Sequence, residues 1–322
     1  MKGSAGSPAG RHLALVGVTA VGKSSVALEV ASRLGDVEIV SIDSMQVYRG
    51  MDIGTDKVSV EDRQRVPHHL IDILEPDEEC SLSWFRDRFD IALAEIEGRG
   101  RRALLVGGTA LYLRAAIDRL EIPGRFPGVR AEFEGVDDTE ELHRRLAVLD
   151  PVAAGRMEPT NRRRVTRALE VTLGSGRPFS SYGPGLDIYP GTEFGLVGLW
   201  APLAVVDQRI GHRCAKQLES GFVEEVRSLA GRPGGLSRTA RQALGYKEVL
   251  AHVECGLALD EALEMAVRRT RRFARRQRAW YRRDPRIWWY GHTGDPGRVV
   301  DSVIEHWTEL IDAGHNDRDR GA

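Results

Sequence analysis

The most constraining feature of the chain is a glycine-rich segment near its start, Gly17-Val18-Thr19-Ala20-Val21-Gly22-Lys23-Ser24. Its spacing is G-x-x-x-x-G-K-[ST], and it lies between an apolar run at 13–16 and a helical pattern at 25–31. In such a loop, backbone N–H groups and the N-terminus of the next helix bind phosphate, Lys23 contacts the phosphates, and Ser24 binds Mg²⁺. The segment therefore predicts a di- or triphosphate site; the competing interpretation is a glycine turn before a core helix.

Short apolar runs alternate with helical patterns along the first hundred residues. Strands are predicted at 38–42 and 103–106 and a helix at 83–98, and nearly continuous apolar strands are typical of a buried parallel sheet. Ligands bind at the carboxyl ends of such strands, so we expect the loop at Gly17, Asp43 and Thr109 to converge. The predicted fold class is α/β, a parallel sheet of the P-loop NTPase type flanked by helices.

The pattern changes at residue 121, after which no strand is predicted before 194. We therefore predict an all-helical domain, 121–193, inserted into a catalytic core formed by 12–120 and 194–292. Within the core, helices are expected over 206–230 and 260–283 and a last strand over 287–290. Residues 1–11 are predicted to be a disordered tail, and 293–322 a C-terminal tail.

Composition narrows the class of protein. The 322 residues contain no apolar run near 18 residues, so no membrane partner is expected. Cys80, Cys214 and Cys255 have neither disulfide nor zinc spacing, which fits a reducing cytoplasm. The net charge is −1, so any nucleic-acid surface has to be a local patch. We expect a cytoplasmic monomer.

Two observations concern acidic residues. The strand at 103–106 ends in Gly107-Gly108-Thr109 without the acid that holds Mg²⁺ in hydrolytic loop proteins, and no Asn-Lys-x-Asp run is present. Both disfavour an ATPase or GTPase and leave kinases and other transferases. Asp43, at another strand end, could bind metal or act as a base toward a nucleophile, but a turn aspartate fits equally well.

Arginine is concentrated in one helical segment. Nine of the sixteen residues at 268–283 are arginine, uninterrupted by any acid, and four more lie at 162–164 and 167. Such a run repels itself and is relieved by a phosphate backbone, which favours a polynucleotide contact over a merely solvated helix. The inner face is predicted to hold Val267, Phe273, Ala274, Trp280 and Tyr281. His68 and His69 lack partners at ligand spacing and are expected to be structural.

Seven segments in order resemble the tRNA dimethylallyltransferases (isopentenylpyrophosphate transferases), over about residues 12–290. They are the loop at 17–24, Ser41-Ile42-Asp43-Ser44-Met45-Gln46-Val47-Tyr48, Met51-Asp52-Ile53-Gly54-Thr55-Asp56-Lys57, Pro67-His68-His69-Leu70-Ile71-Asp72, Gly107-Gly108-Thr109-Ala110-Leu111-Tyr112, Arg164-Val165-Thr166-Arg167-Ala168-Leu169-Glu170-Val171 and Gln242-Ala243-Leu244-Gly245-Tyr246-Lys247. Val18 departs from the usual proline, and the lack of a cysteine/histidine finger after residue 290 resembles the bacterial type.

The resemblance implies transfer of a dimethylallyl group from dimethylallyl diphosphate to N6 of the adenosine 3′ of the anticodon (position 37) in tRNA. It implies Asp43 as the general base with Thr109 beside it. The loop residues Gly17, Val18, Thr19, Ala20, Val21, Gly22, Lys23 and Ser24, together with Mg²⁺ on Ser24, would hold the diphosphate leaving group, with Arg209 or Arg213 as a further clamp. The implied contacts to the tRNA anticodon stem-loop are Asp43, Ser44, Met45, Gln46, Thr109, Arg130, Arg163, Arg164, Arg167, Gln242, Gly245, Tyr246, Lys247, Arg275 and Arg276.

Three alternatives remain at this point. An adenylate isopentenyltransferase would act on a free nucleotide and would need neither the helical insertion nor the arginine helix. A small-molecule kinase would use ATP on the same loop, against which the Asp43-Ser44-Met45-Gln46 segment and the missing strand-end acid count. A non-catalytic, phosphate-gated RNA binder would have no use for Asp43.

Overall fold

The chain forms two compact units in a computed structural model that describes residues 10–183 and 185–319, with side chains to 313. One unit comprises Met1–Ile117 and Gly191–Ala322, and the other Asp118–Pro190. The second unit corresponds to the insertion predicted at 121–193, with each boundary three residues earlier in the chain.

The first unit is built on a six-stranded sheet in the order β3-β2-β4-β1-β5-β6, and each pair of neighbours is parallel. The strands are β1 (His12–Gly17), β2 (Val37–Ile42), β3 (His68–His69), β4 (Arg102–Gly107), β5 (Phe194–Trp200) and β6 (Trp288–Gly291). Crossovers between neighbours confirm the predicted α/β fold class.

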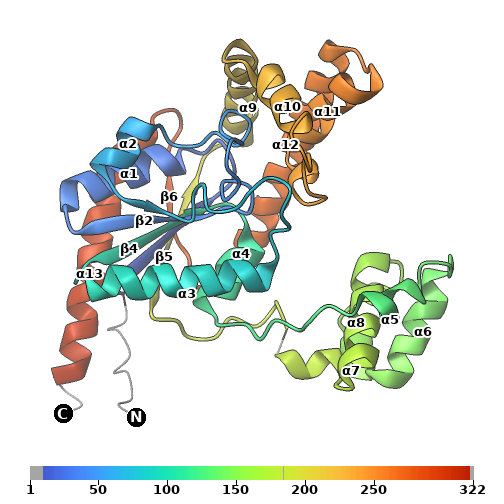
Figure 1. The fold of residues 1–322 in the computed structure, drawn as a ribbon. Coiled ribbons are helices and arrows are strands. Elements are labelled where there is room, and N and C mark those ends of the chain that lie inside the picture. The colour runs from blue at the N-terminus through green and yellow to red at the C-terminus, as the bar shows by residue number, and fades with distance from the viewer. Residues whose placement is uncertain (1–9, 184, 320–322) are drawn as a thin grey trace. The chain divides into compact units, whose positions relative to one another are not determined.

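Helices cover both faces of this sheet (Figure 1). The helices of this unit are α1 (Lys23–Leu34), α2 (Val60–Arg65), α3 (Leu82–Gly98), α4 (Ala110–Ile117), α9 (Leu203–Glu219), α10 (Phe222–Ala230), α11 (Tyr246–Cys255), α12 (Leu259–Tyr281) and α13 (Val300–Asp319). Of these, α10 and α11 contact α9 and α12 and lie away from the sheet. Alternation along β1 decides the layers: Leu13 and Leu15 pack with α1 and α13, while Ala14 and Val16 pack with α3 and α4. The helical segment predicted over 206–230 is divided into α9 and α10, because Gly221 adopts a left-handed φ of 91° between them.

Strand register brings the site segments to one edge of the sheet. Gly107 of β4 pairs with Val16 of β1 on one side and with Ile42 of β2 on the other. The chain therefore leaves all three strands at adjacent points, so the loop at 17–24, Asp43 and Thr109 start side by side, as predicted.

The described residues at both ends of the chain contact the first unit, so the segment after residue 292 packs on this unit as a helix. Residues 1–9 lie outside the description, but the Gly10 N–H donates to the Glu193 carbonyl (2.8 Å), and the Gly10 carbonyl accepts from Trp307 Nε1 (3.0 Å). Trp307 is fully buried on α13, which forms part of the core with Val300 and Val303. The amphipathic face of this helix covers sheet surface that would otherwise be exposed.

The second unit is all-helical, as predicted, with no strand in its described residues. Its helices are α5 (Pro127–Ala131), α6 (Thr139–Leu149), α7 (Pro151–Gly155) and α8 (Arg162–Ser175). Asp138, Asp150 and Asn161 accept hydrogen bonds from backbone N–H groups at the starts of α6, α7 and α8. A separate core forms around Leu142, Leu146, Val165 and Leu169.

Candidate active site

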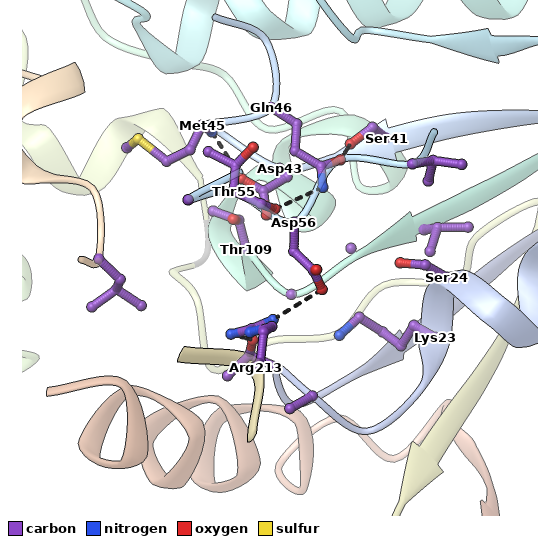
Figure 2. A pocket seen from close by; sticks show the side chains of 18 of the residues that line it. Lys23, Ser24, Ser41, Asp43, Met45, Gln46, Thr55, Asp56, Thr109 and Arg213 are labelled. Atoms are coloured by element: carbon purple, nitrogen blue, oxygen red, sulfur yellow. Dashed lines mark hydrogen bonds and ion pairs between the residues drawn. The ribbon is translucent and has the colours of Figure 1, made fainter. Parts of the chain in front are cut away.

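A cavity of about 1310 Å³ opens at the carboxyl edge of the sheet in the first unit. Its walls come from the phosphate loop, the segment after β2, the turn after β4, and faces of α9 and α12. Figure 2 shows Lys23, Asp43, Thr109 and Arg213 around this space. The cavity exceeds the usual size of a pocket for one small ligand, so it has room for a second reacting group.

The phosphate loop has the conformation that its glycines predict. Gly22 has φ +100°, and a Cβ there would lie 2.6 Å from the Cβ of Pro296, so only glycine fits. Lys23 donates from Nζ to the Val18 carbonyl (2.8 Å). Burial, followed by the charge of Arg213, lowers the pKa of Lys23 to about 8. A bound diphosphate would reverse this effect by supplying negative charge.

Arg209 and Arg213, both predicted as clamps, differ in what they contact. Arg209 donates to the carbonyls of Ala20 and Val21 (3.4 and 3.3 Å) and to Gly294, so its guanidinium braces the loop. Arg213 donates to Thr19 Oγ1 (2.8 Å) and to Asp56 Oδ2 (3.4 Å), across the mouth of the loop. Both arginines line the cavity; Arg209 bonds to backbone carbonyls, and Arg213 bonds to side chains.

Asp43 follows β2 and has one committed oxygen. Oδ1 accepts the Met45 N–H (2.8 Å), and no other hydrogen bond to this carboxylate is formed within the described part of the chain. One oxygen therefore fixes the turn while the carboxylate lines the cavity, so the turn interpretation does not exclude the site interpretation. Ser44, Met45 and Thr109 line the same cavity.

Gln46 is held from both ends of its amide. Its Oε1 accepts from the Ser41 hydroxyl (2.8 Å) and its Nε2 donates to the Thr55 carbonyl (3.2 Å). These bonds fix its position in the cavity wall, which suits a contact to a flat ring better than a flexible side chain would.

Two of the predicted tRNA contacts in the segment 242–247 are wrong. Tyr246 and Gly245 are buried, and the Tyr246 hydroxyl donates to Glu225 (2.5 Å), whose carboxylate also accepts the Ile53 N–H (2.7 Å). Tyr246 thus helps to anchor the loop at 52–54 through Glu225, and the Gly245 N–H donates to Glu248 (3.1 Å). Gln242 lines the cavity and Lys247 is exposed, so for these two the prediction stands.

The arginines of α12 also divide by partner. Arg276 lines the cavity, whereas Arg275 forms an ion pair with Asp207 (2.8 Å). Of the predicted inner face, Ala274 and Tyr281 are buried, Val267 and Trp280 are partly buried against the core, and Phe273 lines the cavity. The fully buried positions of the helix are Ala262, Ala266, Thr270, Ala274, Gln277 and Tyr281. This buried stripe is narrow and consists largely of small residues, which leaves most arginines exposed.

The arginines predicted in the insertion lie in the second unit. Arg167 donates to the carbonyls of Pro123 and Gly124 (2.8 and 2.9 Å) and pairs with Glu170 (2.7 Å), and Arg130 pairs with Glu170 as well (3.3 Å). Arg163 is exposed and, with Arg130, lines a hollow of about 280 Å³. Arg164 is exposed too.

The described residues contain no group of three or more His, Cys, Asp or Glu side chains that could hold a metal ion. His69 bonds to the buried Glu38 (2.6 Å), which fits the structural role predicted for it. His68 Nδ1 lies 2.7 Å from the Val66 carbonyl, and this residue also lines the cavity. In the part of the chain that is described, no helix is both long enough and apolar enough to cross a membrane.

Sequence reasoning missed two contacts. Gln277, buried on α12, lines the cavity and bonds to the phosphate loop, and His292 Nε2 lies 2.8 Å from the Val21 carbonyl. A single glutamine among arginines carries no motif. The spacing of Gln277 from Ala266, Thr270 and Ala274 could have indicated that it is buried, since it continues the same face of the helix.

The chain is similar in sequence to known proteins. The IPP transferase family model matches residues 46–284. The tRNA dimethylallyltransferase of Streptomyces coelicolor is 47% identical over 89% of this chain and 92% of its own, and that of Geobacter metallireducens is 42% identical over 91% and 96%.

The chain is similar to solved structures as well. The full-length tRNA isopentenylpyrophosphate transferase of Bacillus halodurans has a TM-score of 0.70 and 34% identity, covering 95% of this chain and 98% of its own. A eukaryotic dimethylallyltransferase described as acting on tRNA has a TM-score of 0.71 and 25% identity, covering 88% and 74%. The chain belongs to the tRNA dimethylallyltransferase (IPP transferase) family of prenyl-transferring enzymes.

Proposed function

We propose that the protein transfers a dimethylallyl group from dimethylallyl diphosphate to N6 of the adenosine at position 37 of tRNA. The observation that carries the proposal is one cavity containing a phosphate loop, a strand-end carboxylate and an arginine-bearing helix. The phosphate loop binds the diphosphate of the donor, Asp43 accepts the proton of the reacting amine, and the arginines bind the nucleic acid.

The diphosphate binds in the loop, where backbone N–H groups, Lys23 and Arg213 surround it. As the bond between the prenyl carbon and the oxygen breaks, negative charge grows on that oxygen. Fixed cations in a recess stabilise this charge more than mobile water does, which lowers the barrier to departure.

Ser24 fits a magnesium ion bound chiefly by the substrate. Its hydroxyl lines the cavity, whereas its neighbour Ser25 donates to the Gly22 carbonyl (2.9 Å) and is not available. Mg²⁺ keeps several waters and accepts few protein ligands when phosphates are present, so one hydroxyl is sufficient. When bound, the ion supplies further positive charge at the leaving group.

Asp43 takes the proton from the attacking N6 amine. Because one of its oxygens is fixed by the Met45 N–H, the other is directed without a large loss of side-chain freedom. An exocyclic amine is a weak nucleophile, and a positioned carboxylate assists by orienting it and accepting its proton as the new bond to carbon forms.

The adenine has to leave its stack to reach this depth, as in other enzymes that modify bases. Gln46 and Met45 lie where the extruded ring would enter. Arg276 and Gln242 on the cavity wall are placed for flanking phosphates.

The proposal is tested by incubating the protein with dimethylallyl diphosphate, Mg²⁺ and bulk tRNA and analysing the nucleosides by mass. Prenylated adenosine in tRNA supports it. Prenylation of free AMP but not of tRNA would indicate the adenylate enzyme, and consumption of ATP with phosphorylation of a small molecule would indicate a kinase.

The base is tested with Asp43→Asn, which keeps the bond to the Met45 N–H and removes only the charge. We expect kcat to fall by about 10²- to 10⁴-fold while tRNA affinity changes only a few-fold. Glu219→Gln, an exposed acid on the same cavity, is the matched control and should be nearly silent. Near-normal turnover of Asp43→Asn would refute the assignment.

A further inference from the structure

Gln277 joins two strands at the base of the cavity. Its Oε1 accepts the Thr19 N–H (2.8 Å), and its Nε2 donates to the Gly108 carbonyl (2.8 Å). Thr19 lies just beyond the end of β1, and Gly108 just beyond the end of β4. The amide therefore continues the ladder between these strands past its last pair, Val16 with Gly107.

The joined residues are neighbours of the proposed reaction. Thr19 belongs to the phosphate loop and accepts a hydrogen bond from Arg213, and Gly108 immediately precedes Thr109. Gln277 is 5% exposed, so neither backbone group would find water easily if its side chain were shortened. An unpaired buried donor or acceptor is destabilising, so the loop would shift to regain a partner.

A side chain at Gly108 would displace the Gln277 amide. A Cβ at Gly108 would lie 2.2 Å from Gln277 Nε2, while the next atoms are at 3.4 Å or beyond. The backbone of Gly108 has no left-handed φ among those recorded, so the glutamine amide is the main obstacle to a side chain there. The strand-end Gly-Gly-Thr thus accommodates a residue from α12.

We propose that Gln277 is a positioning residue that fixes the distance between the donor side of the cavity, at Thr19, and the acceptor side, at Thr109. It acts from the helix whose exposed face bears Arg276, the next residue along. The inference rests on the proposed prenyl transfer and adds a residue that sets the approach of donor and amine.

The first test measures kcat and KM separately in Gln277→Met, which keeps the volume and loses both bonds. Small misplacement of reacting groups can reduce the rate by about 10²-fold, so we expect kcat to fall about 10- to 100-fold with KM for both substrates within about threefold. Thr270→Ala, on the same buried stripe but outside the cavity lining, is the control and should retain kcat.

The second test is a double-mutant cycle with Gly108→Ala. Alone, this variant should displace the Gln277 amide and reduce kcat as Gln277→Ala does. In the Gln277→Ala background the added methyl meets open space, so the further loss should be less than about twofold. Additive losses would overturn the proposal.

Outcomes for the two proposals are distinguishable. A wild-type protein without prenyl transfer contradicts the proposed function, whereas an active wild type with unchanged kcat in Gln277→Met contradicts only the positioning role. If Gln277→Met and Gln277→Ala both unfold, as measured by circular dichroism, Gln277 is a stability residue and the proposal is overturned.

Discussion

Two arginine-rich helices, α8 in the insertion and α12 in the core unit, look alike in sequence and divide in the same way in the structure. In α8, Arg162 donates to the carbonyls of Phe133 and Val136 (3.0 and 2.6 Å), and Arg167 binds Glu170. Arg163 and Arg164 project from the same helix without an ion pair or hydrogen bond to any described residue from their side chains.

In α12, acids from other elements neutralise part of the charge. Arg269 pairs with the buried Glu248 (2.7 Å), and Arg275 with Asp207. The arginines without an acidic partner among the described residues are Arg272, Arg276, Arg278 and Arg282. The number of arginines in a segment is thus larger than the number available to nucleic acid, because acids from other elements pair with some of them and reduce the repulsion between the rest.

The largest expected effect separates paired from unpaired arginines on α12. Arg272→Glu with Arg276→Glu should weaken tRNA binding about 100-fold at moderate salt and lower the slope of log K against log salt by about 2, since two phosphate contacts are lost. Filter binding over a salt series measures both.

The matched control is Arg268→Glu with Arg275→Glu, which changes the charge equally but replaces arginines paired with Glu264 and Asp207. Its effect on the salt slope should be smaller. Equal salt slopes for the two double variants would contradict this prediction, because the presence of an acidic partner would then not distinguish the arginines that bind RNA.

The converse prediction concerns stability. Arg269→Met leaves Glu248, whose side chain is 4% exposed, without its cation, and should lower the free energy of unfolding by about 2 kcal/mol. Arg268→Met breaks an exposed pair and should cost less than about 0.5 kcal/mol. Urea denaturation of both variants decides; similar values would contradict a structural role for Arg269.

Lys23 extends the comparison to a buried cation without an acidic side chain bonded to it. Its pKa is lowered to about 8, so in the free protein it loses its proton above that pH, and diphosphate has to restore it. Affinity for dimethylallyl diphosphate should therefore fall up to about tenfold per pH unit above pH 8. Below pH 8, Lys23 should cause no change of affinity with pH. Calorimetry at pH 7–9.5 measures this; Lys23→Arg, always charged, should show no such fall.

The smallest effect is on the buried side of α12. The hydroxyl of Tyr281 has no hydrogen-bond partner among the described residues, and burial raises its pKa. Tyr281→Phe removes an unsatisfied polar atom and should raise the free energy of unfolding by about 1 kcal/mol. A loss of stability in thermal melts would show that the hydroxyl has a partner, such as a bound water.

Prediction from sequence succeeded where a local pattern has one structural solution. The apolar strands predicted the sheet, and the glycine loop predicted the edge at which the site lies. The end of the strand pattern near residue 120 predicted the insertion. Prediction failed where burial depends on distant segments: Tyr246 looked like a contact residue in a motif, yet its ring packs edge-on against Phe222, 5.0 Å between centroids.

The sequence by itself determined the phosphate loop, because only glycine can adopt the backbone at Gly22, and it determined the convergence of Asp43 and Thr109, because parallel strands share a carboxyl edge. Tertiary structure alone decided which cations are available. Arg209 bonds to loop carbonyls, Arg213 bonds to the Thr19 hydroxyl, and Gln277 reaches the loop from a helix about 260 residues further along the chain. Such pairings depend on which elements pack together, and packing energy is distributed over many residues with no short pattern.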